Sequence, residues 1–417
     1  MAEFLFAQGL SSVLNMIYGL MCIRILSVPE YTKYVVVFTV QATVTVLMDS
    51  GITGTIVPLV GEKSDDTQLI ADYVASLRGL AHILYFIVGI LLFVAFPRVA
   101  KARGWDFITE LQIIAVLLGL TWFSRVTSAY GSVLIIRKDR NYWYRTQIYS
   151  SVFMLIMLLL AYAAGIMTAV CAMIINLCGV IYIAWRYYVR SKALLQVKGK
   201  KDWRKQKSIL QLASPSIPGV MFYSFQGQIG TYALTFIGRS ESVASIGALG
   251  KVCQIFNFLT PMNPVLVEPY FAKIRRDKLK ANVSVALTCV TLSAVLLLLI
   301  INIAPHVFLW VLGPRYHNLT YEIFLAVVPG VMSLVGGMVA SINAARRFNF
   351  YRFNVANILF SIAIQAICMM KMNLGNLQAV LIFNILSGCP GLILVVMALL
   401  YGFKKGGRVV AADYGLV

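Results

Sequence analysis

The sequence predicts an all-α polytopic membrane protein of about 12 transmembrane helices, in two pseudo-symmetric six-helix bundles around a central cavity. Three observations support this fold class. Of the 417 residues, 60% are hydrophobic and 12% are charged, and the mean hydropathy is +0.81. Apolar runs long enough to cross a bilayer recur along the whole chain, and the loops between them are alternately rich and poor in Lys and Arg. A soluble domain is less apolar than this and shows no such alternation.

Each predicted helix is an apolar run of about 18 residues or more, the length needed to cross the hydrocarbon core. The second and eighth runs contain Pro58, Pro261, Pro264 and Pro269, which predict a kink or an end there. The runs span residues 4–26, 33–60, 77–97, 111–136, 146–163, 167–188, 214–237, 245–271, 282–303, 319–343, 353–371 and 378–402.

The distribution of basic residues predicts the orientation in the membrane. The net charge is +20, and the Lys and Arg residues concentrate in one set of alternate loops. The positive-inside rule places this set and both termini in the cytoplasm of a plasma (inner) membrane protein. The first run begins at Phe4 without a basic n-region, so it predicts a retained span rather than a removable signal peptide. Orientation accounts for the positive charge, and a nucleic-acid partner is not expected.

A basic polar segment, Arg190–Gln211, lies near the middle of the chain. It predicts a division into a bundle at 1–188, a cytoplasmic connector at 189–213, a second bundle at 214–402 and a cytoplasmic tail at 403–417. A connector attracted to anionic membrane lipids is the simpler interpretation, and binding of a regulatory partner is the alternative. Glu30 precedes Pro58 by the same number of residues as Glu241 precedes Pro269, which favours an internal repeat.

The Cys and His residues argue against a metal or catalytic centre. All 7 Cys residues lie in apolar runs without a CxxC spacing, and the 3 His residues are scattered. They are typical of buried hydrophobic side chains and isolated imidazoles. The sequence therefore predicts no metal, no cofactor and no enzymatic activity, and the helices leave no room for a large soluble domain.

Charges inside the predicted spans are the candidate functional residues, because a charge within the bilayer is costly. Arg24 either reaches the interface or faces a central cavity, where its guanidinium could bind phosphate oxygens. Asp49 either pairs with Arg24, caps a broken helix at Ser50 and Gly51, or couples transport to an ion gradient. Arg125 has no acid nearby in the sequence, which favours a cavity-facing position.

Four further residues complete the candidate set. Lys251, flanked by glycine, is a second candidate phosphate ligand. Arg78 is at the cytoplasmic mouth of its span, where a side chain reaching the interface is the simpler interpretation, and it is kept as a candidate substrate ligand. Gln226 and Gln228 could contact sugar hydroxyls or form interhelical hydrogen bonds.

Short motifs add a resemblance. Arg24-Ile25-Leu26-Ser27-Val28-Pro29-Glu30-Tyr31 resembles the Arg-hydrophobic-Leu-Gly/Ser-x-x-Glu-Tyr signature at the first outer turn of bacterial polysaccharide (O-antigen type) flippases, in the multidrug/oligosaccharidyl-lipid/polysaccharide exporter superfamily. Met48–Ile52 is similar to the acidic-x-Gly segment that these flippases carry in their second span. Ala248–Lys251 occupies the place at the start of the eighth span where they often carry a basic residue, and Leu312–Tyr316 resembles their outer turn before the tenth span.

The resemblance implies a flippase that moves polyprenyl-diphosphate-linked oligosaccharide from the cytoplasmic to the outer leaflet by alternating access. It implies a cationic cavity that includes Arg24, Arg125 and Lys251, and possible partnership with polysaccharide-assembly proteins. Many relatives carry an acidic residue in the seventh span, where this chain has Gln226 and Gln228. That departure leaves Asp49 as the main coupling candidate, with H⁺ or Na⁺ as the ion.

Two alternatives remain open. A multidrug or organic-cation exporter of the same superfamily should prefer acidic cavity residues, whereas the charges within the spans here are mostly basic. A membrane-embedded polysaccharide polymerase or acyltransferase should need a large outer loop or a base and nucleophile, and neither is evident in the sequence.

Overall fold

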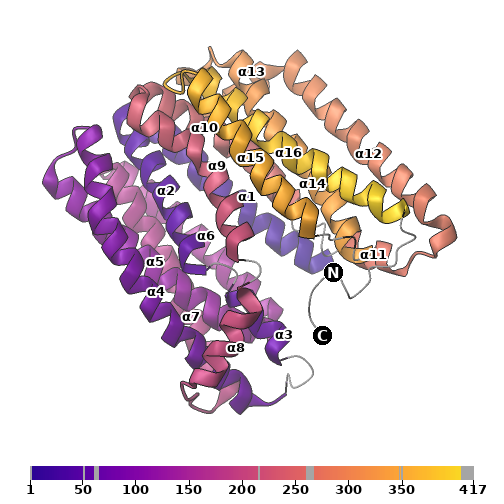
Figure 1. Cartoon of the computed structure of the whole chain (residues 1–417). Coiled ribbons are helices and arrows are strands. Elements are labelled where there is room, and N and C mark those ends of the chain that lie inside the picture. The colour runs from indigo at the N-terminus through magenta and orange to yellow at the C-terminus, as the bar shows by residue number, and fades with distance from the viewer. Residues whose placement is uncertain are drawn as a thin grey trace. The chain divides into compact units, whose positions relative to one another are not determined.

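The computed structural model describes residues 2–49, 52–60, 65–214, 217–259, 267–346, 348 and 351–404. Every regular element in these ranges is a helix (Figure 1). Each predicted span overlaps at least one described helix, which is compatible with twelve crossings, and nine of the described helices are long and apolar enough to cross a membrane. Many of their large apolar side chains are exposed, as expected of surfaces that face lipid. The prediction of an all-α multi-pass membrane protein is confirmed.

The chain forms two compact units, Met1–Phe236 and Ile237–Val417. The predicted bundles at 1–188 and 214–402, with a connector at 189–213, stay a prediction. Most of the predicted tail, from residue 405 on, lies outside the part of the chain that the structure describes.

The first unit contains α1 (Ala2–Ile25), α2 (Val28–Asp49), η1 (Thr53–Thr55), α3 (Ile56–Val60), α4 (Thr67–Ala102), α5 (Phe107–Ile136), α6 (Arg140–Ala163), α7 (Ala169–Leu195), α8 (Trp203–Ala213) and nearly all of α9 (Ile217–Ile237).

The second unit is also helical and is built around α14 (Figure 1). Its core combines apolar side chains of α11, α12, α14 and α16, including Phe271, Val283, Ile342 and Leu399. The elements are α10 (Ser240–Leu259), α11 (Glu268–Lys273), α12 (Arg276–Ile303), α13 (Pro305–Leu312), η3 (Pro314–Tyr316), α14 (Thr320–Arg346), α15 (Tyr351–Lys371) and α16 (Leu377–Lys404).

The two units repeat one pattern of helix neighbours. In the first unit α5 contacts α2, α4 and α7, and α7 also contacts α6. In the second unit α14 contacts α10, α12 and α16, and α16 also contacts α15. The helices correspond in chain order, which supports the internal repeat that the spacing of Glu30, Pro58, Glu241 and Pro269 predicts.

Short polar side chains set the starts of several long helices. Asp66 accepts a hydrogen bond from the Leu69 amide at 2.9 Å, Asp106 from Thr109 at 3.0 Å, and Thr168 from Cys171 at 3.2 Å. Each satisfies a backbone donor that has no partner inside its helix. These caps place the helix boundaries in the turns, where water or headgroups meet the chain.

The basic connector is folded against α4. The amide of Lys200 donates to Asp72 Oδ1 at 2.7 Å, and Lys205 Nζ lies 2.5 Å from Asp72 Oδ2. Gln206, only 1% exposed, donates to the backbone oxygen of Ser76 at 3.1 Å. Ile209 and Ala213 of α8 join an apolar core shared with α3, α4, α5 and α7. The connector thus has a fixed position on the first unit.

The motif turn after α1 joins the starts of α2 and α7. Glu30 accepts hydrogen bonds of 2.7 Å from Lys33 Nζ and from the backbone amide of Ala169, the first residue of α7. A carboxylate at a helix N-terminus satisfies an unpaired amide and interacts favourably with the helix dipole. Tyr31 beside it is 1% exposed. The two signature residues of this turn therefore have a packing role.

Glu30→Ala is expected to lower the stability of the first unit by about 1 to 2 kcal/mol, because it leaves the Ala169 amide unpaired and removes the ion pair with Lys33. The midpoint of thermal unfolding in detergent measures this loss. Glu241→Ala is the matched control, since Glu241 is an exposed residue in the first turn of α10. Equal unfolding midpoints for the two variants would contradict the capping role.

Candidate functional site

The site lies at the end of α2, within the second predicted span. α2 ends at Asp49, and η1 and α3 follow after residues 50 and 51, which lie outside the described residues. The Asp49 carboxylate accepts hydrogen bonds from the amide of Thr53, at 3.3 Å, and from the Thr53 hydroxyl. Asp49 thus satisfies donors at the start of η1, whereas the broken helix that the sequence allowed at Ser50 and Gly51 falls outside the described residues.

An ion pair connects the end of α2 to α5. Arg125 Nη1 lies 2.8 Å from Asp49 Oδ1 and 3.1 Å from Thr53 Oγ1. The sequence places no acid close to Arg125 along the chain, and helix packing supplies one from 76 positions away. The cavity-facing position expected of Arg125 stays a prediction. Pairing of Asp49 with Arg24 was one of the roles left open, and the ion pair described for Asp49 is with Arg125.

The two members of the pair are unequally buried. Arg125 is 6% exposed, whereas the side chain of Asp49 is 42% exposed. Arg125 Nε is buried and has no hydrogen-bond partner among the described residues. An arginine has five N–H donors, and a buried donor without a partner is costly. The guanidinium therefore retains capacity to bind a further oxygen ligand.

The Asp49 carboxylate is open on one side. In every described contact of its side chain the atom involved is Oδ1, and the side chain is 42% exposed. The coupling role expected of Asp49 stays a prediction.

The other predicted residues occupy several elements. Arg24 is exposed at the end of α1, and Arg78 is exposed on α4. Gln226 and Gln228 are half-buried in α9. Lys251 is in α10 of the second unit and is 8% exposed. Their action as one site with Arg125 stays a prediction.

Two residues of these contacts were missed in the sequence. Thr53 bonds both members of the ion pair, and the one-turn spacing from Asp49 to Thr53 was the available signal. Tyr130 on α5 accepts a hydrogen bond of 2.9 Å from Arg78, whose guanidinium carbon also lies 5.8 Å from the centre of the ring. No local sequence pattern links Arg78 to Tyr130, because they are far apart in the chain.

Within the described part of the chain, no group of three or more His, Cys, Asp or Glu residues could hold a metal ion.

Comparisons with known proteins give a likeness in structure. No protein-family profile and no curated protein sequence matches the chain. A lipid II flippase, MurJ, in an inward closed conformation superposes with a TM-score of 0.69 at 14% identity, over 98% of this chain and 90% of that one. A multidrug resistance MATE family transporter of the MOP superfamily gives 0.68 at 12% identity, over 95% and 94%.

A third similar structure is a MOP superfamily transporter from Pyrococcus furiosus, with a TM-score of 0.53 at 12% identity, over 97% of this chain and 93% of that one. Its reversed pocket polarity is taken to suggest a different function for that protein. The likeness to all three extends over nearly the whole of each chain. The protein therefore has the fold of transporters of the MOP superfamily.

Proposed function

We propose that the protein is a transporter that moves an anionic, lipid-linked glycan from the cytoplasmic to the outer leaflet of the plasma (inner) membrane by alternating access. The observation that carries this proposal is the burial of cationic side chains in both units, Arg125 in the first and Lys251 in the second. Buried cations are retained where they bind anions, because their desolvation is otherwise costly. A polyprenyl diphosphate is an anion that guanidinium and ammonium groups bind well.

The same residues suggest how transport is coupled to an ion. The open carboxylate of Asp49 would take up H⁺ or Na⁺ in one state and pair with Arg125 in the other. Release of Arg125 would coincide with substrate binding, so the two ligands would alternate at one ion pair. Arg24, Arg78, Gln226 and Gln228 would add contacts to the diphosphate or the sugars, and the termini would lie in the cytoplasm.

A multidrug exporter is the second candidate, since a multidrug transporter and a lipid flippase superpose on the chain almost equally well. The fold is compatible with both candidate functions, whereas the charges of the buried residues favour one of them. A pocket for organic cations would need acidic side chains, but Asp49 is already paired with an arginine and Lys251 is a buried cation. The buried charges favour an anionic substrate. Neither candidate is an enzyme.

Replacing Lys251 or Arg24 by methionine is expected to reduce transport at least tenfold, because each change removes a cation from the proposed phosphate-binding set. The measurement is growth of a strain that lacks its own lipid-linked oligosaccharide flippase, together with the amount of folded protein in the membrane. Lys371→Met, at an exposed residue at the end of α15, is the charge-matched control.

Full growth with both variants at wild-type protein levels would overturn the anion-binding role. Export of an organic cation by the purified protein, with no movement of lipid-linked oligosaccharide, would favour the multidrug alternative. Export of the organic cation and movement of the lipid-linked oligosaccharide are both measured in proteoliposomes of the purified protein, and the two measurements differ only in the labelled substrate.

A further inference from the structure

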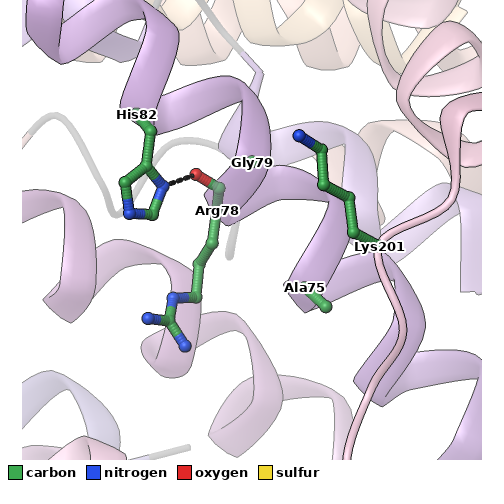
Figure 2. A pocket seen from close by; sticks show the side chains of 5 residues that line it. All are labelled: Ala75, Arg78, Gly79, His82 and Lys201. Atoms are coloured by element: carbon green, nitrogen blue, oxygen red, sulfur yellow. Dashed lines mark hydrogen bonds between the residues drawn. The ribbon is translucent and has the colours of Figure 1, made fainter.

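A pocket of about 320 Å³ lies between α4 and the basic connector in the first unit. It is lined by Ala75, Arg78, Gly79, His82 and Lys201. Figure 2 shows Arg78 and His82 on one side, on successive turns of one helix, and Lys201 on the other side, on the connector. Among the described residues, the lining has two cations and an imidazole and no carboxylate. Such a lining attracts an anion, and the volume is near the lower end of ligand pockets.

The walls of this pocket are held in place by specific contacts. Arg78 donates to Tyr130 at 2.9 Å, and His82 Nδ1 lies 2.5 Å from the backbone oxygen of Arg78. On the other side, the residue after Lys201 is fixed, because the amide of Asp202 donates to Ser76 Oγ at 3.1 Å. Arg78, His82 and the backbone beside Lys201 are therefore held in place before any ligand binds, which lowers the entropic cost of binding.

Glycine at position 79 lets the two walls approach. A Cβ at Gly79 would lie 2.5 Å from Gln206 Nε2 and 2.8 Å from Lys201 Cε, so the stem of Lys201 lies directly against α4. A larger residue would have to displace the ends of these two side chains. The stem of Lys201 lies against α4, and the residue remains exposed.

The position along α4 indicates the source of the anion. Just after His82, the helix presents exposed apolar side chains, with Ile83 at 53% and Phe86 at 70% exposure, as expected where a helix enters lipid. Trp122 packs edge-on against His82 and Tyr85, at ring distances of 5.0 and 5.1 Å, and aromatic side chains of this kind concentrate at the membrane interface. On the connector side, α8 exposes Trp203 and Leu212 while its opposite face packs on the protein. The pocket thus lies at the depth of lipid headgroups.

We propose that this pocket binds the phosphate group of a lipid, with Arg78 and Lys201 as the cationic ligands and His82 as a further polar contact. The bound phosphate is that of an anionic phospholipid headgroup or of a polyprenyl diphosphate, which share the chemistry that the pocket recognises. The pocket shares no lining residue with the Asp49–Arg125 ion pair. Binding of an anionic phospholipid there does not require that the protein transport glycans, whereas binding of a polyprenyl diphosphate rests on the proposed function, in which Arg78 is a substrate contact.

Binding to the purified full-length protein in phosphatidylcholine nanodiscs tests the site, with phosphatidylglycerol or polyprenyl diphosphate added as the probe and read out by native mass spectrometry. Lys201→Gln is expected to lower the affinity for at least one probe about tenfold, the loss of one charge-assisted contact. Lys207→Gln is the matched control, because it removes the same charge from an exposed position of α8 outside the pocket. A second variant, His82→Gln, removes a pocket side chain without changing the connector.

The outcomes separate the sources. An effect on phosphatidylglycerol alone identifies a structural phospholipid, an effect on polyprenyl diphosphate alone identifies a substrate contact, and an effect on both shows recognition of the shared phosphate. Equal losses in Lys201→Gln and Lys207→Gln would mean general attraction to charge and would overturn the proposal. So would binding of neither probe by the wild-type protein. An unchanged thermal midpoint in the variants excludes unfolding as the cause.

Discussion

Asp49→Asn is expected to destabilise the protein by about 3 kcal/mol or more and to stop transport, and a second substitution, Arg125→Met, should restore stability without restoring transport. The asparagine keeps the size and one acceptor of the side chain but removes its charge. Arg125, at 6% exposure, would then be a buried cation without a counter-charge, which typically costs about 3 to 5 kcal/mol. Methionine at position 125 removes that cation.

The two single variants should differ in stability, because the pair is buried on one side only. Arg125→Met leaves Asp49, whose side chain is 42% exposed and can be hydrated, so its cost should be smaller than that of Asp49→Asn. The midpoint of thermal unfolding for the wild type, both single variants and the double variant gives the coupling energy directly. A double variant less stable than Asp49→Asn would contradict the ion pair as the cause.

Asp65→Asn is the matched control. Asp65 pairs with Arg137 at 3.6 Å, but its side chain is fully exposed, so the substitution should change stability by less than about 1 kcal/mol. The transport assay adds a second criterion. Asp49→Asn should bind lipid-linked oligosaccharide and fail to move it under an imposed ion gradient. Undiminished transport by this variant would remove Asp49 from the coupling role.

Gly199→Ala is expected to release the basic connector from α4. A Cβ at this position would lie 1.9 Å from the backbone oxygen of Ala71 and 2.8 Å from the amide nitrogen of Asp72. Neither backbone atom can move aside without bending α4, so the connector must shift instead. Asp72 would then lose its contacts with the Lys200 amide and the Lys205 ammonium.

Limited trypsin digestion measures the release, because the connector carries six Lys and Arg residues between positions 198 and 207. Cleavage there should become about tenfold faster in Gly199→Ala, as expected when a protected segment opens more often. Gly219→Ala is the control, since its Cβ would meet only a Tyr223 ring atom at 3.9 Å. Equal digestion rates would show that the connector is not held by this contact.

The helical membrane fold could be predicted from the amino-acid sequence alone. Hydrophobic runs of spanning length are local properties, and bilayer thickness converts each of them into a helix without knowledge of its neighbours. The equal spacing of Glu30 from Pro58 and of Glu241 from Pro269 similarly predicts an internal repeat, which the common pattern of helix neighbours supports. Asp49 could also be recognised as a special residue, because a carboxylate within an apolar run is costly wherever the helix packs.

The partners of these charged residues could not be predicted from the sequence, because they depend on helix packing. Arg125 pairs with Asp49 because α5 packs against α2, and Lys201 and Arg78 line one pocket because the connector packs on α4. Glu30, part of a motif that suggested function, has a packing role at the start of α7. Such contacts join residues far apart in the chain, and their geometry depends on which helices are neighbours. Hydropathy and local spacing report the burial of a residue, whereas its partner is set by the packing of whole helices.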